Sequence, residues 1–316
     1  MKIIVKDRPE RLLIGNARKS ETTQMLYRDR VQCMFPQVFS LASGKGGVGK
    51  TSIAVNLAFA FTRLGKRVLL LDADLGLGNI DVLLGLTPQY TLEHLFEKSK
   101  TIADISIKGP GGVFIVPASR GMDKLVNLED HQKLSLLNEI DLIAHQIDVL
   151  LIDNTAGISS NALYFDIAAQ GLILISTPEA TSIKNTFAVI KVLHMNFRKK
   201  RIMILMNMVD HEKEAREGFH KITLMADRFL DHPSIDYLGF IPIDEKLQAA
   251  VKAQRAVLEI CPTAPSSRRF MRLAKYLASK PIHIEGNGQI QFLRQKSLYC
   301  HPLRHLKESL IKKGGS

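Results

Sequence analysis

Seven short apolar runs, separated by stretches with a helical pattern, constrain the fold of this 316-residue chain more than any other feature. They occupy residues 38–43, 67–74, 112–119, 148–154, 171–177, 201–209 and 235–242. Most are continuously apolar rather than alternating, which is typical of parallel strands buried on both faces. Helical patterns lie at 50–65, 129–146, 181–196 and 211–230. We therefore predict an α/β fold, a doubly wound and mostly parallel sheet flanked by helices, in a single domain at 36–279.

The charge of +12 is concentrated at the two ends of the chain. Residues 1–34 carry eight Lys or Arg against four acids, and residues 280–316 carry seven against two. We therefore predict a basic N-terminal extension at 1–35 and a basic C-terminal tail at 280–316. Such tails favour an acidic partner or lipid surface and make DNA an unexpected partner, since a DNA-binding surface is expected on the folded body. Added solubility is the alternative.

Three features of the sequence bear on where in the cell the protein is found: its apolar runs, its N-terminal residues and its cysteines. No apolar run approaches the roughly 18 residues needed to cross a bilayer, and residues 1–13 do not form a signal peptide pattern. The three cysteines, at positions 33, 261 and 300, form no C-x-x-C pair, which argues against disulfides and a zinc or iron–sulfur site. We predict a cytoplasmic protein.

A glycine-rich loop follows the first apolar run and opens the first helix. Residues 43–51 read SGKGGVGKT, which contains Gly44, four free positions and then Gly49-Lys50-Thr51. This is the phosphate-binding pattern, in which backbone N–H groups surround phosphates, the lysine reaches the β- and γ-phosphates and the hydroxyl contacts Mg²⁺. The predicted nucleotide-binding residues of the loop are Gly44, Lys45, Gly46, Gly47, Val48, Gly49, Lys50, Thr51 and Ser52. Lys45 has no role in this pattern.

Three aspartates stand at the ends of two other apolar runs. Asp72 and Asp74 close the run at 67–74, and Asp153 closes the run at 148–154. In open α/β sheets ligands bind beyond the carboxyl ends of the strands, so these carboxylates are predicted to face the nucleotide and its metal. The alternatives are capping or loop aspartates, with Asp153 capping a helix that begins near Ser160.

Three segments, KGGVGKT, DADLGLGNID and LLIDNTAG, together resemble the nucleotide motifs of the MinD/ParA family of deviant Walker A ATPases. The resemblance implies ATP and Mg²⁺ as cofactors and an ATP-bound homodimer. It also implies a role for Lys45, which stands where that family has a lysine that reaches the phosphates of the other subunit. Iron–sulfur carriers related to this family are disfavoured, because the cysteine pair they use is missing.

The same resemblance assigns roles to single residues. Lys45, Lys50 and Asp74 are the predicted catalytic residues, with Asp74 positioning the attacking water. Thr51, Asp72 and Asp153 are the predicted magnesium ligands. Asn207 aligns with the asparagine that reads the adenine edge, and Pro242 is predicted to close the base pocket.

Four segments spread over nearly the whole central domain read LLDADLGLGNIDVLLGL, ISTPEATSIKNTFAVIKVL, MNMV and YLGFIPIDEKLQAAVKAQRAV. They narrow the resemblance to the FlhG branch (FleN/YlxH), which controls flagellar number and placement. This implies a slow, partner-stimulated ATPase. The partners it suggests are an FlhF-like GTPase, flagellar switch proteins or a flagellar transcription activator. Residues 1–35 do not match the segment with which such proteins stimulate FlhF. Division-site placement, DNA partitioning and sequestration of the activator remain alternatives, whereas a small-molecule ligase is disfavoured.

Residues 302–313, PLRHLKESLIKK, place Leu303, Leu306 and Leu310 on one face at helical spacing. We interpret this segment as a short amphipathic helix that gives a peripheral contact with the inner face of the cell membrane. One copy would bind lipid weakly, and two copies in a dimer would bind more tightly. A helix docked on the body or a frayed tail is the alternative.

Overall fold

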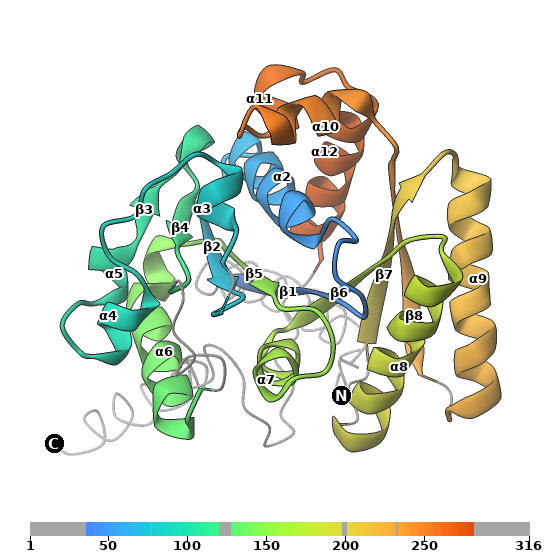
Figure 1. Ribbon diagram of the computed structural model, residues 1–316, viewed down its shortest axis with the longest axis horizontal. Helices are drawn as coiled ribbons and strands as arrows, with labels where there is room; N and C mark the ends of the chain where they lie inside the picture. The colour runs from blue at the N-terminus through green and yellow to red at the C-terminus, as the bar shows by residue number, and fades with distance from the viewer. Residues whose placement is uncertain (1–35, 77, 120–127, 198–200, 232, 281–316) are drawn as a thin grey trace, which may run out of the picture.

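The computed structural model describes residues 36–76, 78–119, 128–197, 201–231 and 233–280 (Figure 1). The predicted N-terminal extension at 1–35 and the predicted amphipathic helix at 302–313 lie outside the described residues. The described part has the predicted architecture, a single sheet flanked by helices on both faces (Figure 1).

The sheet has eight strands in the order β3-β4-β2-β5-β1-β6-β7-β8. All neighbouring strands pair in parallel except β3 and β4. The strands are β1 (Gln37–Ser43), β2 (Val68–Ala73), β3 (Ile107–Lys108), β4 (Phe114–Val116), β5 (Val149–Asn154), β6 (Gly171–Ser176), β7 (Arg201–Val209) and β8 (Ser234–Pro242). Every residue of β1, β2 and β5 is buried, which is why these strands read as continuous apolar runs.

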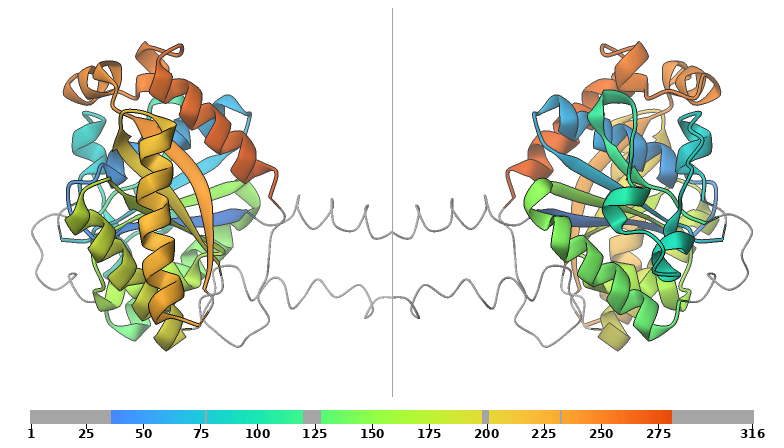
Figure 2. Two further views of the ribbon diagram at one scale, coloured as in Figure 1. Left: turned by 90° about the vertical axis from the view of Figure 1, so that its right-hand side faces the viewer. Right: turned by 90° about the vertical axis from the view of Figure 1, so that its left-hand side faces the viewer.

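Helices cover the two faces of the sheet (Figures 1 and 2). One face carries α2 (Lys50–Arg63), α3 (Ile80–Leu83), α10 (Glu245–Lys252), α11 (Val257–Ile260) and α12 (Pro265–Ala278). The other carries α4 (Leu92–Phe96), α5 (Ile102–Ile105), α6 (Asp130–Ile143), α7 (Ser160–Ala168), α8 (Ala180–Phe197) and α9 (Glu212–Phe229). Short 3-10 turns lie at Pro110–Gly112 and Ala144–Gln146. No helix among the described residues is long and apolar enough to cross a membrane.

Two local features differ from the sequence prediction. The apolar run at 112–119 forms a strand only over Phe114–Val116, because Pro117 lacks the N–H group that would continue the ladder. The antiparallel edge strand β3 was not predicted, since two residues carry no periodic signal. The helix predicted at 50–65 is confirmed over Lys50–Arg63, and Gly65, with a φ of 76°, follows its C-cap Leu64 as a helix-ending glycine.

Candidate nucleotide site

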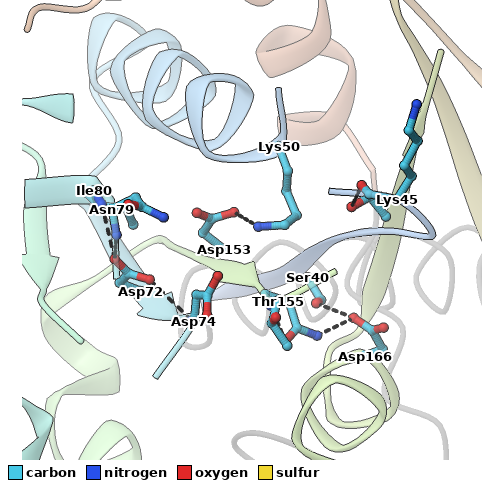
Figure 3. Close-up of polar contacts among 12 residues, drawn as sticks. Ser40, Lys45, Lys50, Asp72, Asp74, Asn79, Ile80, Asp153, Thr155 and Asp166 are labelled. Carbon is cyan, nitrogen blue, oxygen red and sulfur yellow. Dashed lines mark hydrogen bonds and ion pairs between the residues drawn. The ribbon is translucent and has the colours of Figure 1, made fainter. Parts of the chain in front are cut away.

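Parallel pairing brings the predicted site residues to one edge of the sheet. Strand β5 lies between β1 and β2, so Asp153 is in register with Leu41 on one side and with Asp72 on the other. The glycine-rich loop leaves β1 and leads into α2 at the same edge. Residues 44–51, 72 and 153 are therefore neighbours in space although they are far apart in the sequence (Figure 3).

The loop has a backbone that needs glycine at defined positions. Gly49, with a φ of 85°, lies directly before α2, and a Cβ atom there would be 2.5 Å from the amide nitrogen of Asn207. At Gly44 a Cβ atom would be 2.3 Å from the backbone of Asn185 in α8. By contrast, Cβ atoms at Gly46 and Gly47 would meet nothing within 4 Å. The loop is thus packed against the protein at its ends and open above its middle.

Lys50 and Asp153 form a buried ion pair at the centre of the site. The Lys50 Nζ atom lies 2.8 Å from Oδ1 of Asp153, and the two side chains are 10% and 1% exposed (Figure 3). Thr51 also donates a hydrogen bond to Asp153. Burial raises the pKa of Asp153, and Lys50 and Thr51 oppose that shift. Asp153 does not cap the following helix, since the side chain of Ser159 accepts from Ala162 N there.

The carboxylate of Asp72 is turned toward backbone N–H groups. Its Oδ2 atom accepts from Asn79 N at 3.0 Å and Ile80 N at 3.1 Å, and its Oδ1 atom accepts from Asp74 N at 3.2 Å (Figure 3). Burial raises the pKa of Asp72 to about 7, and the neighbouring charge of Asp153 adds to the shift. Asp72 therefore holds the start of α3, which is the capping role left as an alternative, while Asp74 is partly exposed beside Asp153.

The residues present fit a nucleotide and Mg²⁺. The Ser52 hydroxyl is buried without a hydrogen-bond partner among the described residues, at the start of a 14-residue helix whose N-terminus favours anions. Thr51 and Asp153 offer two oxygen ligands, which is the ligand type that Mg²⁺ prefers. A phosphate oxygen bound at this helix N-terminus would be a suitable partner for the Ser52 hydroxyl.

Lys45 has a partner that the sequence did not reveal. Its ammonium group forms an ion pair with Glu179, in the segment between β6 and α8. Both side chains are substantially exposed, so water and salt weaken the pair. The Ser43 hydroxyl supports the loop beneath it by donating to the Lys45 carbonyl at 3.0 Å.

The residues predicted to hold the base lie at the ends of β7 and β8. The Asn207 amide donates to the carbonyl of Val48 at 2.7 Å, which joins β7 to the loop. Met208 beside it has a φ of 56°, an uncommon conformation for a residue with a side chain. Pro242 pairs in register with Val209 and also lines a cavity of about 420 Å³ beside β8, which contains no residue of the glycine-rich loop.

A buried polar network behind the site was missed by sequence reasoning. Oδ1 of Asp166, in α7, accepts from Ser40 Oγ at 2.6 Å and from Asn154 Nδ2 at 2.9 Å (Figure 3). The carbonyl of the Asn154 side chain accepts from Thr155 N at 2.9 Å. This network fixes the chain directly after Asp153. The sequence feature that could have indicated this network is Asn154 in DNTAG. Its partner Asp166 in α7 could not be predicted, because it depends on how α7 packs against the sheet.

Comparison with known proteins agrees with this geometry. A family described as "ParA: NUBPL iron-transfer P-loop NTPase" matches residues 35–278. "Antiactivator FleN" of Pseudomonas aeruginosa is 42% identical over 84% of this chain and 94% of its own length. "Flagellum site-determining protein YlxH" of Helicobacter pylori is 27% identical over 76% of this chain and 81% of its own.

A solved structure shows the same fold. The "MinC:MinD cell division protein complex" of Aquifex aeolicus contains a chain with a TM-score of 0.65 and 25% identity. The match covers 79% of this chain and 98% of that one. From the family match over residues 35–278 and the similarity to FleN, this chain belongs to the ParA family of P-loop NTPases.

Proposed function

We propose that this chain is an ATP-driven molecular switch that dimerises when it binds ATP and controls the number or placement of flagella. The observation that carries the proposal is the 42% identity to Antiactivator FleN over 94% of that protein. The similarity to YlxH, whose name includes flagellum site determination, supports the same output. The iron transfer named in the family description is disfavoured by the spacing of the three cysteines.

The ion pair at the centre of the site suggests how the switch operates. Lys50 would exchange Asp153 for phosphate oxygens, which frees Asp153 to join Thr51 in holding Mg²⁺. Magnesium, when bound, neutralises charge on the phosphates. Asp74 would position the attacking water. Lys45 would leave the weak, exposed pair with Glu179 and reach the phosphates of a second subunit, so that ATP binding is coupled to dimerisation.

The partner sets the rate and the output of such a switch. An FlhF-like GTPase, flagellar switch proteins and a flagellar transcription activator are the candidate partners. The word antiactivator in the name of FleN favours a second form of the proposal, in which the protein sequesters the activator and ATP turnover is incidental. The MinD similarity favours division-site placement as the alternative output.

We place the protein in the cytoplasm, in peripheral contact with the membrane.

Deletion of the gene tests the output. Extra or misplaced flagella on cells of normal length, counted by electron microscopy, are expected. Minicells, filaments or lost DNA with normal flagella would instead assign the chain to division or partitioning.

Two substitutions then separate the switch from sequestration. Asp74→Ala is expected to give a gain-of-function phenotype, because a dimer that cannot hydrolyse ATP cannot reset, whereas sequestration alone predicts the wild-type phenotype. Lys45→Ala is expected to abolish ATP-dependent dimers in light scattering while ATP binding is retained. Glu179→Gln is the matched control, because it removes the partner of Lys45 in its own chain and leaves Lys45 free to act.

A further inference from the structure

The cavity beside β8 has a positively charged wall. Arg268, Arg269 and Arg272 line it from α12, and Asp210 and Glu212 line it from the N-terminal end of α9. In the left view of Figure 2, the orange strand β8 runs between the yellow helix α9 and the red helix α12. We call this cavity the α12 cleft.

The three arginines of the cleft differ from several other arginines on the surface, which are paired with carboxylates. Arg201, Arg216 and Arg255 each contact a carboxylate at 2.7 Å. Within the described residues, by contrast, none of the three cleft arginines forms an ion pair with a carboxylate. A guanidinium group presents paired N–H donors that match a carboxylate. The cleft therefore holds unused donors for acidic groups.

The rest of the lining narrows the class of ligand. Glu212 is already paired with Arg216 at 2.7 Å, so Asp210 is the acid that remains to balance the arginines. The floor is apolar, with the buried ring of Phe240 beside Pro242. The guanidinium group of Arg269 lies 4.0 Å from the centroid of that ring. The lining thus combines excess positive charge on one wall with an apolar floor.

We propose that the α12 cleft docks an acidic peptide segment of a partner protein. Its carboxylates would bind Arg268 and Arg272, which lie one helical turn apart, and one apolar side chain would pack against Pro242 at the floor. A membrane surface or nucleic acid fits less well, because its regularly spaced phosphates would also approach Asp210, whereas a peptide can place an uncharged residue beside that carboxylate. The proposal does not depend on nucleotide binding or on a flagellar output.

Selection from a random dodecapeptide phage library on the full-length protein tests this inference. The selected peptides are expected to contain at least two acidic residues next to an apolar one. Their fluorescein-labelled forms are expected to bind in fluorescence polarisation, with a Kd that rises at least tenfold in the Arg268→Glu/Arg272→Glu variant and also rises with salt. The matched control is Lys221→Glu/Arg228→Glu, which makes the same charge change farther along α9 and should leave the Kd unchanged.

Three results would overturn the proposal. The first is a selection without acidic enrichment, or peptides that bind the charge-reversed variant as well as the wild type. The second is a loss of ATP affinity in the Arg268→Glu/Arg272→Glu variant, which would make the cleft a part of the nucleotide site through Pro242. The third is that this variant loses binding to a DNA duplex or to vesicles with phosphatidylglycerol while peptide binding is unchanged.

Discussion

Replacement of Asp72 by asparagine tests how the site tolerates a buried carboxylate. Asp72 is 1% exposed, and its pKa is raised from 3.8 to about 7 by burial first and then by the charge of Asp153. Between these two values the unfolded chain releases the proton while the folded protein keeps it. The free energy of unfolding therefore falls by about 1.4 kcal/mol for each pH unit in this window. This contribution to stability is fully present below about pH 4 and is lost as the pH rises through about 7.

The Asp72→Asn variant does not lose this stability as the pH rises, because the amide side chain is neutral at every pH. From the two pKa values, the stability of the variant relative to the wild type should rise by about 2.6 kcal/mol between pH 5 and pH 8. Independently of pH, the amide loses one acceptor for the N–H groups of Asp74, Asn79 and Ile80, at a cost of about 1–3 kcal/mol. The variant should therefore be close to the wild type at pH 5 and about 1–3 kcal/mol more stable at pH 8.

The measurement is urea unfolding followed by circular dichroism at pH 5, 6.5 and 8. EDTA is present throughout, because a divalent cation would hold the carboxylate ionised. The exposed Asp231→Asn variant is the control for removal of a carboxylate from the surface. A difference between Asp72→Asn and the wild type that stays constant over this pH range would refute the reasoning. It would mean that the three N–H groups keep Asp72 ionised in the folded protein.

Other substitutions test the loop, the buried network and a second carboxylate. Gly49→Ala should weaken ATP binding at least tenfold in calorimetry, because its Cβ atom would meet the amide of Asn207, whereas Gly65→Ala, where the space is open, should leave binding unchanged. Asp166→Asn should lower the free energy of unfolding by about 1–3 kcal/mol and reduce kcat for ATP more than it raises KM, because the network supports the chain after Asp153. A fall in kcat no larger than the rise in KM would show that Asp166 does not position that segment. Burial raises the pKa of Asp244, but hydrogen bonds from Ser266, Lys246 and Leu247 together outweigh it and the net pKa is lowered. Asp244→Asn should therefore destabilise the protein at pH 7, and urea unfolding at pH 3.5 should show a smaller difference, since this contribution is lost as pH falls.

Much of the fold was predictable because its signals are local. Buried parallel strands must be apolar along their whole length, so β1, β2 and β5 could be located without any knowledge of their neighbours. The glycine-rich loop and the aspartates at strand ends were predictable for a similar reason. The turn of the loop needs glycine at defined positions, and ligands in such a sheet bind beyond the strand ends, where the aspartates lie.

Contacts between distant segments could not be predicted, because they depend on how the elements pack. The sequence located Lys50, Asp72 and Asp153 at the predicted edge of the sheet. It could not show that Lys50 binds Asp153, that Asp72 holds the start of α3, or that Glu179 holds Lys45.

The sequence by itself therefore determined the type of sheet, the phosphate-binding loop and the membership of a family of nucleotide-dependent proteins. Only the tertiary structure decided the partner of each charge and the position of the α12 cleft. Its arginines are separated from Asp210 by 58 residues or more, and they line one cleft because α12 and α9 both pack beside β8. The local pattern of apolar residues determines where helices and strands form. Ion pairs and cavities depend on how those helices and strands pack together, which the spacing of residues along the sequence does not show.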